Sequence, residues 1–276
     1  MELCYNLQTC MDSYLERDLE LCEREGFKAI EINFPKAKKY LEKHSLEQLE
    51  QLLHSYQMKV ATLNAIFGTS FCDDKQWTSV TDQFKYACEL GQACDCNKVI
   101  VLSCEAVHLP TKVSDEDIMK NSVEVLHKLA DIGSANGMNI GYEPVGTMAV
   151  PNLQTATKII QEVNRKEVGM VIDDFNLYLW DLLADVDEIK DLDPAKITIV
   201  HLNDAAKIPF ARLDQNHRCM PGDGRIDVVN FMKCVKANGY HGYVSVEVLN
   251  PEIWAKGPEV VIPEAYEKAN KILASI

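Results

Sequence analysis

The stretch ITIVHLN, residues 197–203, shows the pattern from which the fold of this chain can be predicted. Its β-branched residues favour a strand, and successive side chains of a strand point to opposite faces. Ile197, Ile199 and His201 therefore share one face, and the imidazole lies near the carboxyl end of the strand. A polar ring at the end of an otherwise apolar strand makes His201 the first candidate site residue.

Seven further apolar runs accompany this one, separated by longer amphipathic stretches. They are LCYNL (3–7), AIEIN (29–33), KVATLNA (59–65), KVIVLS (98–103), NIGYEP (139–144), GMVIDD (169–174) and GYVSVEV (242–248). Helical patterns between them include residues 13–26, 45–57 and 114–137, and a capping serine opens the last two. Eight strand–helix units in 276 residues predict an α/β fold, a (β/α)8 TIM barrel in which residues 1–276 form one domain.

The competing architecture is a doubly wound open sheet. That fold usually carries a glycine-rich phosphate-binding turn after its first strand. The corresponding segment here, NLQTCMDS (6–13), contains no glycine. The barrel is therefore the better prediction.

Composition and charge exclude several classes of protein. The net charge of −14 offers no basic surface for nucleic acid. No apolar stretch approaches the roughly 20 residues of a membrane span, and the first residues lack a basic segment followed by an apolar run. We therefore expect a cytoplasmic protein that binds neither nucleic acid nor membrane, with its ten cysteines reduced. The sequence leaves open whether the chain forms a homo-oligomer.

Four groups that can bind metal fall at the ends of four successive predicted strands. Glu143 ends the fifth predicted strand, which Pro144 stops, Asp173 shares a face with Val171 in the sixth, and His201 lies in the seventh. In VSVEV the three valines share one face, which leaves Glu247 on the other. Active sites of TIM barrels lie at the carboxyl ends of the strands. We therefore expect Glu143, Asp173, His201 and Glu247 to meet inside the barrel mouth.

Such a cluster implies a cation. Three carboxylates buried close together repel one another strongly unless a positive charge compensates them. Oxygen ligands with one imidazole suit one divalent metal ion, either Mn, Mg, Co or Fe, or Zn in a site of higher coordination. Other inward-facing polar residues are candidates for contacts with substrate hydroxyls, namely Asn6, Glu31, Asn64 and Asn176.

The same residues carry a resemblance to a known family. The matching stretches run from the first strand to the eighth and include MELCYN (1–6), RDLELCEREGF (17–27), LEKHSLEQL (41–49), VNRKEVGMVID (163–173), PGDGRID (221–227) and VSVEV (244–248). On these stretches the chain resembles the xylose-isomerase-like TIM-barrel superfamily, and within it the inosose isomerases of bacterial myo-inositol catabolism. The resemblance implies the four metal ligands named above. It also implies that Arg218, just before the PGDG loop, faces the substrate.

The implied activity is a divalent-metal-dependent isomerisation of a keto-inositol (inosose) or a similar small polyhydroxylated ketone through an enediolate. Glu143 and Glu247 would act as base and acid, in either order. The alternative is a ketose epimerase or a keto-sugar lyase or dehydratase on the same metal site. Endonuclease activity, which this superfamily includes, is disfavoured by the acidic charge.

Two departures from the family pattern bear on the substrate. The family motif Asp-x-Phe-His reads Asp173-Asp174-Phe175-Asn176 here, and the Asn176 amide can hydrogen-bond a hydroxyl but cannot act as an acid or base near neutral pH. The segment PVGT (144–147) lacks the second glutamate that ketose 3-epimerases use on their substrate. The second departure counts against the epimerase.

Overall fold

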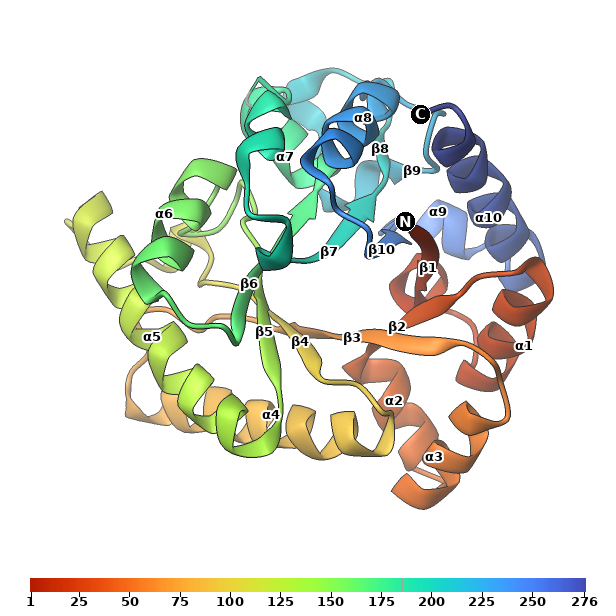
Figure 1. Cartoon of the computed structure of the whole chain (residues 1–276), viewed down its shortest axis with the longest axis horizontal. Coiled ribbons are helices and arrows are strands. Elements are labelled where there is room, and N and C mark those ends of the chain that lie inside the picture. Colours follow the sequence, from red (N-terminus) through yellow and green to blue (C-terminus); the bar gives the residue numbers. More distant parts are fainter. Residues whose placement is uncertain (185) are drawn as a thin grey trace.

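The computed structural model describes residues 1–184 and 186–276, and it confirms the predicted barrel. Eight parallel strands close in the order β1-β10-β7-β6-β5-β4-β3-β2, and Figure 1 looks into the ring that they form. The strands are β1 (Glu2–Asn6), β2 (Ala29–Asn33), β3 (Lys59–Ile66), β4 (Lys98–Val101), β5 (Asn139–Tyr142), β6 (Val168–Asp173), β7 (Ile197–Leu202) and β10 (Tyr243–Val246). Each one lies within or overlaps one of the eight apolar runs.

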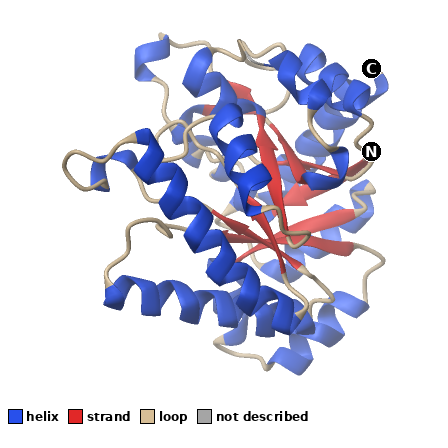
Figure 2. Ribbon diagram, turned by 60° about the vertical axis from the view of Figure 1, so that its left-hand side comes forward, coloured by secondary structure: helices blue, strands red, loops and turns tan. Residues whose placement is uncertain are grey.

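Helices enclose the strands, as Figure 2 shows. They are α1 (Leu15–Glu25), α2 (Phe34–Leu41), α3 (Leu46–His54), α4 (Asp74–Ala93), α5 (Asp115–Asn136), α6 (Leu153–Val163), α7 (Asp174–Asp181), α8 (Val228–Asn238), α9 (Pro251–Trp254) and α10 (Pro258–Ala274). Ser45 and Ser114 cap α3 and α5 as predicted, each within a reciprocal capping box. Within the two described ranges, no helix combines the length and apolar character that a bilayer span requires.

The alternation of side chains produces two separate apolar cores. The larger one lies between the strands and the helices and includes Ile172, Val200 and Val246. The smaller one fills the barrel interior and includes Cys4, Ala29, Ala61, Ile100, Leu102, Val171 and Ile199. Val171 and Ile199 are two residues before Asp173 and His201 on the same inward faces. Apolar packing therefore closes the barrel beneath the polar side chains at its carboxyl end.

A two-stranded antiparallel ribbon, which the sequence did not predict, lies beyond β7. It pairs β8 (Asp204–Ala205) with β9 (Arg218–Cys219). The buried Asp204 carboxylate accepts hydrogen bonds from the backbone amides of Gly222 (3.1 Å), Gly224 (2.8 Å) and Ile226 (2.8 Å), and from Ala205 (2.8 Å). A Cβ on Gly224 would lie 2.2 Å from the Ala205 carbonyl oxygen. The PGDG segment is thus fastened to Asp204, and this arrangement fixes the strand that begins with Arg218.

We predict that Asp204→Ala lowers the free energy of unfolding by about 3 kcal/mol, because four backbone donors lose their acceptor. The matched control is Asp227→Ala, which removes an exposed cap with one hydrogen bond, from Asn230, and should cost about 1 kcal/mol. Urea unfolding measures both values. Equal losses would show that Asp204 does not hold the loop.

Candidate metal centre

The four predicted ligands meet at the carboxyl end of the barrel. Glu143, Asp173, His201 and Glu247 each offer one ligand atom, and these atoms all lie within 4.8 Å of one another. Strand register brings them together, since His201 of β7 pairs with Asp173 of β6 on one side and with Ser245 of β10 on the other. All four side chains are buried.

His201 has the geometry of a metal ligand. Its buried Nδ1 makes no hydrogen bond, although it lies 3.1 Å from Glu247 Oε2, 3.4 Å from Asp173 Oδ2 and 3.7 Å from Glu143 Oε1. Its Nε2 lies 3.1 Å from Glu31 Oε1. A proton on Nε2, donated to Glu31, leaves a lone pair on Nδ1 that faces three carboxylates. This donor set fits a divalent cation.

The charges of the cluster agree with that fit. Burial, reinforced by Glu247 and Asp173, raises the pKa of Glu143 from an ordinary 4.5 to about 7. Burial alone would lower the pKa of His201, but the carboxylates around it, Glu247 and Glu31 first, raise it well above its usual value. Both shifts report an excess of negative charge, which a bound cation would relieve.

Arg218 is the one guanidinium within hydrogen-bonding reach of the cluster among the residues described. It is 2% exposed, and its Nη1 donates to Asp173 Oδ2 at 2.6 Å and to Glu247 Oε2 at 3.2 Å. Burial opposes ionisation of Asp173, but the Arg218 charge together with His201 and the backbone amide of Asn176 outweighs burial and holds the pKa of that carboxyl below its usual value. The guanidinium also stacks on the Phe175 ring, 4.8 Å from its centroid.

Asn6 and Glu31, two of the residues predicted to contact substrate hydroxyls, lie next to the clustered side chains. Asn6 and Glu31 are fully buried and are not among the residues that line the cavity over the cluster. Asn6 Nδ2 donates to Glu247 Oε1 at 2.8 Å and to Glu31 Oε1 at 3.1 Å. Besides Asn6, Glu31 contacts His201 and accepts a hydrogen bond from Thr62.

The cavity over the cluster has a volume of about 180 Å³. Three of the predicted substrate-contacting residues, Asn64, Asn176 and Arg218, line it beside Glu143 and Glu247. The Asn64 amide donates to Glu247 Oε1 at 3.1 Å, and the Asn176 amide donates to Glu143 Oε1 at 3.0 Å. The cavity therefore has a polar floor and amide groups on its sides.

Sequence reasoning missed four further polar residues of this cavity, Gln8, Glu105, Thr147 and Gln215. Gln215 joins Asn176 to Arg218, since its Nε2 donates to Asn176 Oδ1 at 2.8 Å and its Oε1 accepts from Arg218 Nη2 at 2.7 Å. Gln8 directly follows the first apolar run, a position that could have marked it. Gln215 lies in an irregular segment without periodicity, so its sequence gave no comparable signal.

We predict that chelator-treated protein gains thermal stability when Mn²⁺ or Zn²⁺ is restored. Metal at 100 times its dissociation constant should add about 2.7 kcal/mol, which raises the melting temperature by roughly 5 °C or more in a chain of this size. His201→Gln should abolish the gain. His54→Gln, at an exposed position on α3, should keep it. A full gain in the His201 variant would contradict the assignment.

Comparison with known proteins agrees with the barrel and the cluster. A sequence model described as xylose isomerase-like TIM barrel matches residues 19–271. A Bacillus velezensis protein named inosose isomerase is 33% identical over 99% of this chain and 98% of its own length. A Bacillus subtilis protein of the same name is also 33% identical, over 100% of this chain and 98% of its own length.

A solved structure extends this similarity to three dimensions. The crystal structure of the IOLI protein with a bound zinc atom superposes with a TM-score of 0.93. The two sequences are 31% identical, and the match covers 99% of this chain and 98% of that one. The similarity therefore extends over nearly the whole barrel.

Proposed function

This chain belongs to the xylose isomerase-like TIM barrel family, and we propose that it is a divalent-metal-dependent isomerase of an inosose or a similar polyhydroxylated ketone. The observation that carries the proposal is the convergence of Glu143, Asp173, His201 and Glu247 beneath a small cavity. Identity of 33% over nearly the whole length of curated inosose isomerases supports it.

The four clustered side chains would hold the cation, and the zinc atom of the related IOLI structure supports this role. A divalent cation, when bound there, supplies positive charge that stabilises negative charge on neighbouring substrate oxygens. Glu31 would keep the His201 ring oriented through Nε2. Asn6 would fix Glu247 and Glu31 relative to each other.

Isomerisation moves the carbonyl to the adjacent carbon. A base removes the proton from the hydroxyl-bearing carbon and the electrons shift to form an enediolate. A proton then returns to the former carbonyl carbon, while the hydroxyl proton passes to the former carbonyl oxygen. Glu143 and Glu247 remain the candidates for these transfers, and their surroundings differ. Glu247 accepts hydrogen bonds from Asn6, Asn64 and Arg218, whereas within the described ranges the side-chain donor to Glu143 is Asn176 alone.

These surroundings favour Glu143 as the group that carries the proton between carbons. Three donors, one of them charged, occupy the Glu247 oxygens and leave them little freedom. Glu143 has one amide donor and lines the cavity. Asn64, Asn176 and Arg218 would then recognise the substrate hydroxyls from the cavity wall.

The cysteines and the net charge bear on the cellular compartment and on the partner of the protein. All ten cysteines are free thiols and eight of them are buried, as expected in a reducing compartment. The net charge of −14 disfavours nucleic acid. We therefore propose a cytoplasmic enzyme whose partner is a small polyol ketone.

We predict that the metal-loaded protein converts an inosose into a second inosose in D₂O and places deuterium on the carbon next to the carbonyl. Proton NMR of the products measures both events. Inversion at one carbon without movement of the carbonyl would instead identify an epimerase. Loss of water or chain cleavage would identify a lyase. An unchanged inosose would refute the proposed reaction.

We predict that Glu143→Gln lowers kcat by about 10²-fold or more, the usual contribution of a positioned acid or base. Glutamine keeps an oxygen ligand, so elemental analysis should still find metal in the variant. The exposed Glu162 on α6 provides the control, because Glu162→Gln should retain the wild-type rate. Full activity of a metal-loaded Glu143 variant would show that another residue transfers the proton, and Glu247 would be the next candidate.

A further inference from the structure

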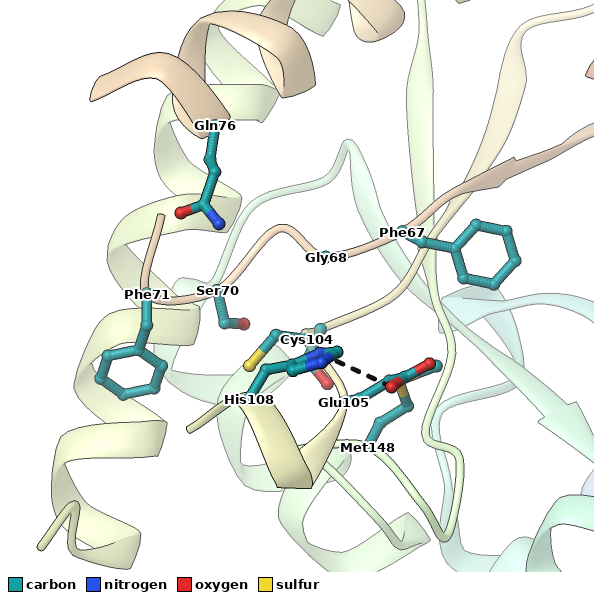
Figure 3. Close-up of a pocket in the computed structure, with 10 residues that line it drawn as sticks. Phe67, Gly68, Ser70, Phe71, Gln76, Cys104, Glu105, His108 and Met148 are labelled. Carbon is teal, nitrogen blue, oxygen red and sulfur yellow. Dashed lines mark ion pairs between the residues drawn. The ribbon is translucent and has the colours of Figure 1, made fainter. Parts of the chain in front are cut away.

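A second and larger cavity adjoins the one over the metal cluster. It has a volume of about 580 Å³ and lies between the segments 67–76 and 103–108, with Met148 at its side (Figure 3). Phe67, Glu105 and Met148 line both cavities. The metal-side space of about 180 Å³ is below the roughly 300 Å³ at which ordinary ligand pockets begin. The neighbouring cavity lies well within the ordinary range.

One wall of this cavity holds a buried hydroxyl without a hydrogen-bond partner. Ser70 is 4% exposed, and its Oγ has no partner among the described residues. The nearby Tyr142 hydroxyl pairs with Ser122 at 3.3 Å, and its contact with Ser70 is weaker and longer than a hydrogen bond. In Figure 3 the Ser70 hydroxyl points from its loop into the space between the two segments. An unpaired buried hydroxyl is unfavourable, and a hydroxyl group of a ligand would satisfy it.

The same loop holds two phenylalanines in unfavourable states. Phe67 is 55% exposed at the boundary of the two cavities. Phe71 has a φ of +54°, a left-handed conformation that is rare for a bulky residue, and its amide donates to Asn121 Oδ1 at 2.9 Å. Strained backbone of this kind gathers at ligand-binding sites. The two rings provide apolar surface against which a ring can pack.

The polar groups of the opposite segment determine the class of ligand. Glu105 and His108 form an exposed pair, with Oε2 and Nδ1 3.5 Å apart, and both appear beside Met148 in Figure 3. No lysine or arginine is among the residues that line this cavity, so a phosphate or carboxylate would find little compensation. A carboxylate and an imidazole beside aromatic rings suit neighbouring hydroxyls on an uncharged ring.

We propose that this cavity is a second subsite, which binds an uncharged hydroxylated ring joined by a glycosidic oxygen to the ring held over the metal cluster. The substrate class then includes glycosylated keto-polyols as well as free inososes. This inference rests on the proposed function, because it extends the substrate of the same site. Shared lining by Phe67, Glu105 and Met148 makes the two spaces continuous for a linked molecule.

The test is calorimetric binding to the metal-loaded protein, so that its readout is independent of turnover. The two probes are myo-inositol and myo-inositol that carries a galactosyl ring through a glycosidic oxygen. We expect the glycosylated compound to bind about tenfold more tightly, the effect of one or two net hydrogen bonds. Ser70→Ala and His108→Ala should each bring the ratio of the two dissociation constants towards one. His54→Ala, an exposed histidine on α3, should leave the ratio as in wild type.

Two results would overturn the subsite. One is an equal dissociation constant for both probes in wild type. The other is a mixture of myo-inositol and free methyl galactoside that binds as tightly as the joined compound. The glycosidic link would then contribute nothing to binding. Isomerisation of free inosose is measured separately by NMR. Failure there with intact preference for the glycosylated probe would refute the proposed reaction and retain the subsite.

Discussion

Mutual repulsion among three buried carboxylates is the main constraint on the structure at the carboxyl end of the barrel. Glu143, Asp173 and Glu247 lie together with His201 where water is largely excluded. Charges in such surroundings interact far more strongly than at the surface. Arg218 supplies one positive charge at 2.6 Å from Asp173, which leaves the cluster negative overall. A divalent cation completes the balance, and the ligand geometry is consistent with that role.

Neighbouring polar side chains contact three of the four clustered residues and fix their positions. Glu31 faces the far nitrogen of His201, Asn6 and Asn64 donate to Glu247, and Asn176 donates to Glu143. Positioned donors of this kind fix the rotamers of ligands and their protonation states. The asparagine at position 176 fits this arrangement, because its amide donates to Glu143 and accepts from Gln215. An amide can do both at once without changing charge.

Alternation of side chains explains why so much of this site could be predicted. The inward positions of Asp173, His201 and Glu247 follow from a period of two, and neighbouring strands bring them to one level. Irregular segments have no such period. The β8–β9 ribbon, the role of Gln215 and the backbone contacts of Asp204 depend on tertiary packing. For Asn6 and Glu31, alternation predicts only that the side chains point inward. Whether they reach the cavity or the clustered side chains beneath it depends on their depth in the barrel.

The order of these parts along the chain separates chemistry from recognition. Every clustered ligand comes from the second half of the barrel, between residues 143 and 247, whereas the larger cavity is lined mostly by residues 67–108. The loops of the first half can therefore change in length or composition while the ligand set keeps its scaffold. In a barrel divided in this way, new substrates can be acquired by exchange of two adjacent loops, with the reaction itself inherited unchanged.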